Sequence, residues 1–401
     1  MLERVMIISG ESSGELYGSF LAGALRERNP GIALEGVGGD RMQAAGVRLI
    51  ARIASAFGAV EAVRAYREIK RTYHTVVETL SSFNPQVLVT IDYPDFNIRV
   101  AKKAKSAGIK VLYFVSPQVW AWRKGRVRVI GRVVDKMAVI LPFEEDIYMK
   151  AGIPCEFVGH PVMDEIRDIV QAAGFGMQDL GSAQLKAHFR KELGLDSSRP
   201  VLAVMPGSRR HEVQMLLPSL AEAVSGITLK YPGCQLTVPV APNLEPDVLA
   251  ALRERLGTAS AGALRFSDNS VKTLLAADYA IIASGTSTLQ AALAGVPLVV
   301  IYRLSPITFL LGKLIVKVKY ISLVNILLDK SVKGCTALRV RELLQGAASG
   351  KNIMAEIARL MEEASYREEM IRQLALVRDL FRDKSASLRV AEILEEMGAQ
   401  G

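Results

Sequence analysis

Two aspartates stand where an apolar run ends, in the stretch IDYPDFN at residues 91–97. Asp92 comes directly after the run QVLVTI, where a partly buried carboxylate with a raised pKa could act as a general base. Two other uses stay open. Asp95 or Asn97 could cap a helix that begins near Ile98, or the two aspartates could bind a metal. They are not in a D-x-D arrangement and no histidine lies near them in the sequence, which argues against the metal.

Two stretches in the second half have the residue types of anion-binding helix starts. VLAVMPGSRRHEV places Gly-Ser and two arginines after an apolar run, and ASGTSTLQAAL places Ser284, Gly285 and Thr286 after another. Backbone N–H groups at a helix start favour anions, and arginine binds phosphate oxygens. Neither stretch is a G-x-x-x-x-G-K-[ST] P-loop. We therefore expect a metal-free clamp for a nucleotide diphosphate.

Two loops in the first half are less specific. ISGESSGELYG lacks the G-x-G-x-x-G spacing, so an NAD oxidoreductase would rest on this loop alone. Its Glu11 and Glu15 would repel phosphate and suit sugar hydroxyls, although the loop could also be a plain tight turn. FVSPQVWAWRKGRVRVIGR interleaves Trp120 and Trp122 with basic residues. Such a stretch can bind single-stranded nucleic acid, hold a phosphate or sugar, or pack on its own domain.

These loops need strands before them and helices after them. Short apolar runs such as RVMIIS, QVLVTI and KVLYFVS alternate with stretches of helical period, which is typical of β-α-β units on a parallel sheet. The pattern fades over 165–197 and then restarts, and 401 residues are too many for one ordinary core. We predict an α/β fold of two doubly wound Rossmann-like domains, 1–165 and 166–369, with helices over about 370–401 that pack back on the first.

Composition narrows the partners and the compartment. The 50 Lys and Arg exceed the 41 Asp and Glu, and the net charge of +9 favours nucleic acid, phosphorylated substrates or an anionic membrane. Cys155, Cys234 and Cys335 match no zinc or disulfide spacing, which suits a reducing compartment. The start MLERVMIISG lacks the pattern of a signal peptide, so we expect a cytoplasmic protein.

One apolar segment, 305–328, has membrane-spanning length. Lys313, Lys317 and Lys319 lie near its middle, where each charge would be costly in a bilayer, so we expect it not to span. Docking on an anionic lipid surface and an ordinary core helix with solvated lysines both remain open.

The chain resembles the lipid-A-disaccharide synthase family of glycosyltransferases. The matching motifs run almost end to end and include GESSGELYG, IDYPDFN, YFVSPQVWAWRKGRV, LPFE, FVGHPVMDE, MPGSRRHEV, SGTSTLQ and ISLVN. The resemblance implies the GT-B fold, in which two Rossmann-like domains face a cleft. It also implies a hexosyltransferase that joins UDP-2,3-diacylglucosamine and 2,3-diacylglucosamine 1-phosphate into a β-1′,6-linked disaccharide 1-phosphate and releases UDP.

The resemblance also assigns residues. It implies that the first domain binds the acceptor, that the second binds the UDP-sugar, and that Asp92 is catalytic. The implied donor-binding residues are Gly207, Ser208, Arg209, Arg210, Glu212, Ser284, Gly285, Thr286, Gln290 and Asn325. The implied acceptor-binding residues are Gly10, Glu11, Ser13, Gly14, Glu15, Asn97, Ser116, Trp120 and Arg123. His160, in the GHP motif, is expected to be structural.

The chain departs from the family pattern at several positions. Gln290 stands where the family usually has Glu, and a Gln offers one acceptor oxygen and one donating amide. Glu15 replaces a usual Asp, Tyr17 a common His, and the run SLVNILLDKSVKGC differs after Asn325.

We expect no metal or cofactor, no nucleic acid, and peripheral attachment to the inner face of the cytoplasmic membrane, while a homodimer stays open. The alternatives are another nucleotide-sugar enzyme of the same fold, which should lack IDYPDFN and SPQVWAWR, and a basic nucleic-acid-binding protein.

Overall fold

The computed structural model describes residues 1–52, 59–121, 125–241, 244–260, 262–305, 319–332 and 339–399, with side chains except over 59–66. Trp122, Arg123, Lys313, Lys317 and Cys335 lie outside the described residues, and so does most of the apolar segment considered for membrane docking. The chain forms two compact units. Unit 1 is Met1–Asp164 with Asp383–Gly401, and unit 2 is Glu165–Arg382.

Unit 1 contains a seven-stranded sheet in the order β3-β2-β1-β4-β5-β6-β7, with parallel pairings. Its strands are β1 Arg4–Ser9, β2 Ala33–Gly38, β3 Arg48–Arg52, β4 Val87–Ile91, β5 Lys110–Phe114, β6 Lys136–Val139 and β7 Cys155–Phe157. Its helices are α1 Ser12–Arg28, α2 Asp40–Ala44, α3 Ala59–Phe83, α4 Pro94–Ser106, α5 Arg126–Ile130, α6 Pro142–Met149 and α17 Ala386–Ala399.

Unit 2 contains a six-stranded sheet in the order β10-β9-β8-β11-β12-β13, again with parallel pairings. Its strands are β8 Val201–Met205, β9 Gln235–Pro239, β10 Leu264–Ser267, β11 Tyr279–Ala283, β12 Leu298–Tyr302 and β13 Glu342–Leu344. Its helices are α8 Ala183–Glu192, α9 Arg210–Lys230, α10 Pro246–Ala259, α11 Ser270–Ala276, α12 Thr286–Ala294, α14 Leu323–Lys330, α15 Gly350–Glu362 and α16 Ala364–Asp379. Helix α7, Pro161–Ala172, contains the boundary between the units.

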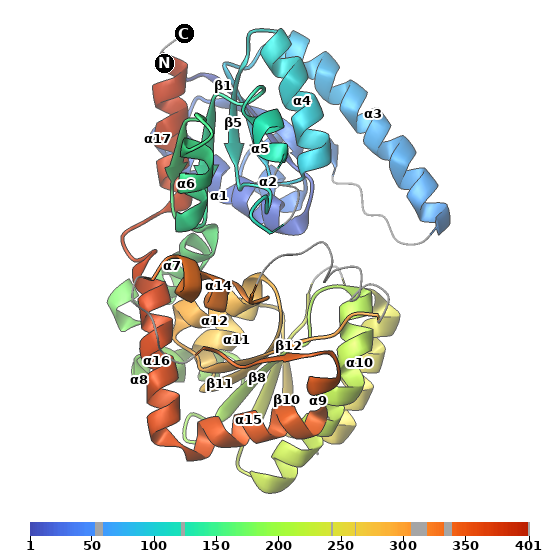
Figure 1. Cartoon of the computed structure of the whole chain (residues 1–401), viewed down its shortest axis with the longest axis vertical. Helices are drawn as coiled ribbons and strands as arrows, with labels where there is room; N and C mark the ends of the chain where they lie inside the picture. Colours follow the sequence, from blue (N-terminus) through green and yellow to red (C-terminus); the bar gives the residue numbers. More distant parts are fainter. Residues whose placement is uncertain are drawn as a thin grey trace. The chain divides into compact units, whose positions relative to one another are not determined.

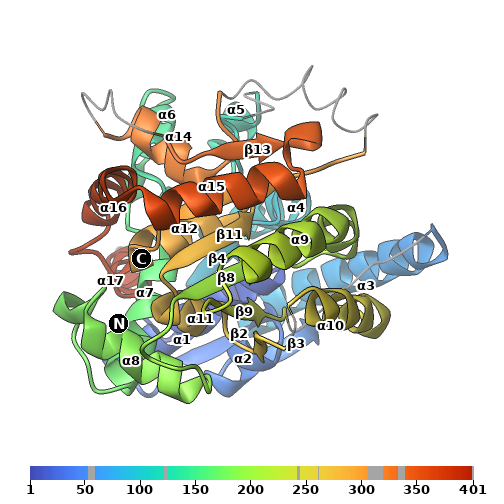
Figure 2. The same cartoon turned by 90° about the horizontal axis from the view of Figure 1, so that it is seen from below.

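The central strands of both sheets are buried along their whole length. All five residues of β4 (VLVTI) and of β8 (VLAVM) are buried. In unit 2, α9 packs beside α10 and α15, whereas α11 packs beside α8 and α12 (Figure 2). A parallel sheet covered by helices requires such continuous apolar strands, and the prediction of doubly wound α/β domains is confirmed.

The chain returns to unit 1 at its end. Helix α17 packs on α1 (Figure 1), and the Asp164 carboxylate accepts the Ser387 backbone N–H at 2.9 Å and its hydroxyl at 3.0 Å. From the sequence, we predicted that the helices packing back on the first domain begin near residue 370. The return begins instead at Asp383, because α16 packs against α12 and α14 and groups with unit 2.

Among the described helices, none combines the length and the apolar character that crossing a membrane requires.

The hydrogen bonds at Asp164 predict a measurable anchor for α17. Ser387→Ala should lower the free energy of unfolding by about 1 kcal/mol in urea titrations, because a buried hydroxyl bond to a carboxylate is lost. The matched control is Ser198→Ala, which removes a 2.7 Å hydroxyl bond to Asp196 on an exposed loop and should change stability by less than about 0.5 kcal/mol. Equal effects of the two substitutions would contradict the anchor.

Candidate active site

The turn after β4 holds Asp92 in an unusual backbone conformation. Asp92 and Tyr93 both have left-handed φ angles, 47° and 46°, which cost most L-residues roughly 1–2 kcal/mol each. The Asp92 carbonyl oxygen accepts two hydrogen bonds, from the Tyr113 hydroxyl at 2.7 Å and from the Asn97 amide nitrogen at 2.7 Å. The Asp92 N–H donates to the Phe114 carbonyl at 3.1 Å. The main chain of Asp92 is therefore fixed at both its N–H and its carbonyl.

The helix after this turn does not begin as the sequence suggested. Helix α4 begins at Pro94, its N-cap residue is Tyr93, and no side chain caps it, so the alternative of a cap by Asp95 or Asn97 is wrong. Asn97 is buried instead and donates to the carbonyl of Ile91, at the end of β4, and to that of Asp92 in the turn. Exposed Asp95 pairs with Arg126 at the start of α5. Asn97 thus holds the turn, and its side chain is turned away from solvent.

The Asp92 carboxyl has the electrostatics of a base. Burial is the main cause that raises its pKa to about 6, the charge of Glu11 raises it further, and the Tyr93 N–H opposes the shift. Glu11 is close because β1 pairs with β4, which aligns Ser9 with Ile91. A carboxylate with this pKa is mostly ionised at neutral pH and remains a useful proton acceptor.

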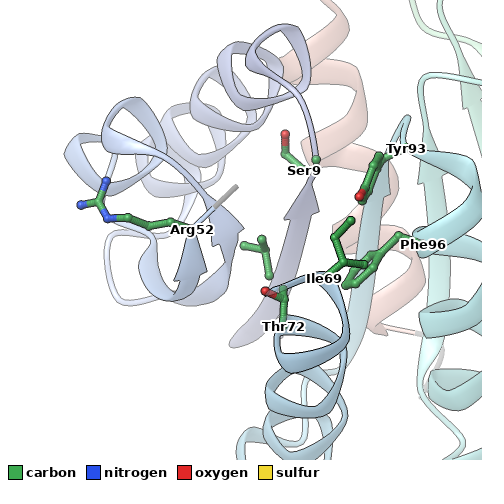
Figure 3. A pocket seen from close by; sticks show the side chains of 8 residues that line it. Ser9, Arg52, Ile69, Thr72, Tyr93 and Phe96 are labelled. Carbon is green, nitrogen blue, oxygen red and sulfur yellow. The ribbon is translucent and has the colours of Figure 1, made fainter. Parts of the chain in front are cut away.

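The loop after β1 packs directly against this turn. A Cβ on Gly10 would lie 2.2 Å from Cγ of Tyr93, so only glycine leaves room for that ring. The rings of Tyr93 and Phe96 lie 5.5 Å apart and, with Ile69 of α3, line a small and mainly apolar recess that also touches Ser9 (Figure 3). Tyr93, which lines the recess, directly follows Asp92 in the chain.

The other acceptor residues predicted in this loop differ in their surroundings. Ser13 is exposed, whereas Gly14 is buried and a Cβ there would lie 2.8 Å from the Ser9 hydroxyl. The Glu15 carboxylate accepts the Arg41 backbone N–H at 2.9 Å near the start of α2. Glu11, Ser12 and Ser13 are therefore exposed polar groups at this strand exit, and Glu15 joins α1 to α2.

The loop after β5 is held by α6. The Ser116 hydroxyl lies 2.6 Å from that of Tyr148, and the Trp120 indole N–H donates to Glu144 at 3.1 Å. Val115, at the start of the loop, has a left-handed φ of 66°, which is rare for a β-branched residue. Ser116 and Trp120 are both largely buried, so the structure brings them close to the site mainly as supports of this loop.

Sequence reasoning assigned no role to Glu144. Its side chain is almost fully buried, it also accepts the Leu141 N–H at 3.2 Å, and burial raises its pKa to about 8 despite these donors. The charge of Asp92 adds to this shift, so the two carboxyls interact. In the sequence, Glu144 directly follows the apolar run MAVILPF and is the last residue of the motif LPFE.

His160 has the structural role that the sequence suggested. It is buried, its Nδ1 accepts the Val162 N–H at 3.2 Å, and its ring lies edge-on to Tyr17. Burial lowers its pKa to about 3, so the imidazole is neutral at physiological pH.

In unit 2, two helix starts lie at neighbouring strand ends. β8 pairs with β11, so the loop that leads from β8 into α9 adjoins the one that leads from β11 into α12. Gly207 has a φ of 105°, and a Cβ there would lie 2.9 Å from the Glu212 carboxylate and 3.6 Å from Cβ of Ala283. Neither helix has a side-chain cap. The first N–H groups of both helices can therefore serve an anion.

The residues at these two helix starts differ in their exposure to solvent. Ser208, Gly285 and Thr286 are exposed, while the Ser284 hydroxyl donates to the Ile321 carbonyl at 3.1 Å. The exposed residues are the ones that a ligand could reach without rearrangement of the loop.

The two arginines of the GSRR stretch differ. Arg210 makes a bidentate ion pair with Asp247, at 2.7 and 2.8 Å, and its Nε lies 3.3 Å from Glu245. Arg209 has a 61% exposed side chain and lies 3.6 Å from Glu212. Arg209 is therefore the cation that can reach a ligand with less loss of existing contacts.

Two other residues that were predicted to bind the UDP-sugar, Gln290 and Asn325, are largely buried. The Gln290 amide donates to Glu165 at 3.2 Å, and its side chain is only slightly exposed. Asn325 donates to the Val340 carbonyl and to Glu342, both at 2.8 Å, and accepts the Val340 N–H at 3.0 Å. Asn325 thus fixes the chain before β13, while Gln290 and Glu165 form a polar pair in unit 2.

Known proteins are similar to this chain along nearly its whole length. The family model described as lipid-A-disaccharide synthetase matches residues 5–393. A lipid-A-disaccharide synthase of Trichlorobacter lovleyi is 40% identical over 401 residues, covering 99% of this chain and 98% of the relative. One of Myxococcus xanthus is 37% identical over 396 residues, covering 98% of this chain and 97% of the relative.

Solved structures share the fold at low identity. A UDP-GlcNAc 2-epimerase of Neisseria meningitidis, bound to UDP-GlcNAc, has a TM-score of 0.65 at 12% identity and covers 98% of this chain and 100% of its own. MurG of Acinetobacter baumannii has a TM-score of 0.56 at 13% identity and covers 98% of this chain and 99% of its own. The predicted GT-B fold is confirmed. By sequence and fold, the chain belongs to the lipid-A-disaccharide synthetase family of glycosyltransferases.

Proposed function

We propose that this chain transfers the sugar of UDP-2,3-diacylglucosamine to 2,3-diacylglucosamine 1-phosphate and releases UDP, with Asp92 as the general base. The observation that carries the role of Asp92 is a carboxyl with a pKa raised to about 6 at the exit of a buried central strand. The substrates follow from membership of a family whose curated relatives are named lipid-A-disaccharide synthases.

The proposed step is an in-line displacement. Asp92 accepts the proton of the acceptor 6-hydroxyl while that oxygen bonds to the anomeric carbon of the donor, and the bond from this carbon to the UDP oxygen breaks. The configuration at the anomeric carbon is inverted, which gives the β-1′,6 linkage. One carboxylate is sufficient because the leaving group is a diphosphate that needs no proton.

Negative charge grows on UDP as it leaves, and unit 2 has groups that suit it. The uncapped starts of α9 and α12 offer backbone N–H groups, and exposed Arg209 adds a positive charge. Backbone N–H groups are fixed in place and stabilise a developing anion without reorganising. We propose that they bind the diphosphate without a metal or cofactor.

Both substrates are anionic amphiphiles, and we propose that the protein meets them at the inner face of the cytoplasmic membrane. The net charge of +9 supports peripheral attachment to anionic lipid.

Asp92→Asn tests the proposed base. Turnover, measured as disaccharide 1-phosphate and UDP formed by the purified protein, should fall about 10²–10⁴-fold, because the amide cannot accept the proton. UDP affinity, measured by calorimetry, should stay near that of the unchanged protein. Asp95→Asn, an exposed neighbour paired with Arg126, is the matched control and should keep its turnover within about threefold. Near-normal turnover of Asp92→Asn would remove Asp92 from this role.

The raised pKa of Asp92 predicts an acid limb in the pH profile. Because the base must be ionised, kcat/KM should be flat above a pH of about 6 and fall tenfold per unit below it. Other titratable groups whose charges interact with Asp92 are Glu11, Tyr113 and Glu144. Glu11→Gln removes a charge that raises the pKa, so its limb should move to lower pH. A limb that stays in place in Glu11→Gln would contradict this account.

The GSRR arginines provide a matched pair of variants. Arg209→Gln should lower turnover about 10²-fold and weaken UDP binding, because a donor to the leaving group is lost. Arg210→Gln should affect UDP binding less and mainly loosen the contact between α9 and α10, since its guanidinium is already bound to Asp247 and Glu245. The reverse ranking of the two variants would assign the diphosphate to Arg210.

Turnover of the unchanged protein in EDTA should equal turnover without it, because the proposed diphosphate site contains no metal.

A further inference from the structure

A single carbonyl oxygen receives two buried side-chain donors beside the proposed base. The Tyr113 hydroxyl and the Asn97 amide both lie 2.7 Å from the Asp92 carbonyl oxygen, and both side chains have an exposed fraction of 0%. Tyr113 comes from the neighbouring strand β5, and Asn97 comes from the helix that follows the turn. The carbonyl belongs to a residue with a left-handed φ of 47°. Two separate elements thus fix one strained peptide.

Packing alone does not require the Tyr113 hydroxyl. A phenylalanine would fill nearly the same space in the middle of the sheet, and a buried hydroxyl costs free energy unless it is hydrogen-bonded. The bond that it makes is not part of the sheet ladder, because its acceptor lies in the turn beyond β4. Burial and the charge of Asp92 raise the Tyr113 pKa well above its usual value, so the phenol stays protonated and can donate.

We propose that Tyr113 is a positioning residue for the transfer reaction, because its hydroxyl, together with the Asn97 amide, holds the left-handed turn that directs the Asp92 carboxylate. The proposal rests on the proposed function of Asp92 as the base. Tyr113 touches the main chain of Asp92 rather than a reacting atom, so it acts through Asp92.

The loss of this bond has a physical consequence. Asp92 and Tyr93 are held against a conformational preference, and with one donor fewer the turn can relax toward more favourable φ angles. The carboxylate then spends more time in water and less in line with the acceptor hydroxyl. Because burial is the main cause of its raised pKa, greater hydration lowers that pKa toward the usual range of aspartate.

Tyr113→Phe tests the proposal by removing one oxygen atom. We expect kcat to fall about tenfold, with KM for both substrates within about twofold and UDP affinity unchanged. The acid limb of kcat/KM should move below its value of about 6. The charged or titratable groups that interact with Asp92 or Tyr113 are retained in this variant: Glu11, Asp95, Arg126, Glu144 and Tyr148.

Tyr366→Phe is the matched control. Its hydroxyl is also buried and donates to Glu356 at 2.6 Å, but both residues lie in unit 2. It should lose stability to a similar degree as Tyr113→Phe and leave kcat and the acid limb unchanged. A role of Tyr113 in stability alone would make the two variants alike in kinetics.

The outcomes separate the two proposals. If Tyr113→Phe keeps the kcat and the acid limb of the unchanged protein, the positioning role is overturned, and Asp92 as the base still stands. If Asp92→Asn keeps near-normal turnover, the proposed base itself fails. Should Tyr113→Phe not fold, Asn97→Ala removes the other donor and should show the same lowered kcat and shifted limb, and unchanged kinetics there would overturn the proposal.

Discussion

The candidate site depends on the left-handed turn at Asp92 and Tyr93. That conformation is unfavourable for both residues, and it persists because the Asp92 carbonyl accepts two buried donors while the Tyr93 ring packs where Gly10 has no side chain. The same turn directs the carboxylate and starts α4 at Pro94. Exits of three adjacent strands, β1, β4 and β5, therefore meet around one residue.

The ionised carboxylate of Asp92 lowers the free energy of unfolding, because it is largely buried. With a folded pKa of about 6 against 3.8 for an ordinary aspartate, Asp92 favours folding most when protonated. That contribution is complete below a pH of about 4 and is lost as the pH rises through about 6, on the order of 3 kcal/mol. Burial also raises the pKa of Glu144, to about 8, so Glu144 likewise favours folding most when it is protonated. At neutral pH it is largely uncharged, which keeps a second negative charge away from Asp92.

Unit 2 has a different arrangement, one that suits a bound anion. Two adjacent strands end in helices without side-chain caps, so main-chain N–H groups supply the positive field. Arg210 joins α9 to the acidic start of α10, and Arg209 stays exposed. Adjacent arginines in one motif thus have different tasks, one structural and one available to a ligand.

The sequence by itself determined the alternation of apolar strands and helices, the strand exits, and Asp92 as the acid that helix capping leaves unexplained, because these depend on residues close together in the chain. Tertiary structure decided the rest. Asn97 holds the turn and does not cap the helix, Glu144 accepts a hydrogen bond from Trp120, and Arg210 is bound by Asp247, 37 positions away. The return of the chain to unit 1 begins at Asp383. These contacts join residues from separate elements, and their hydrogen bonds and burial exist only once the strands are aligned in the sheet.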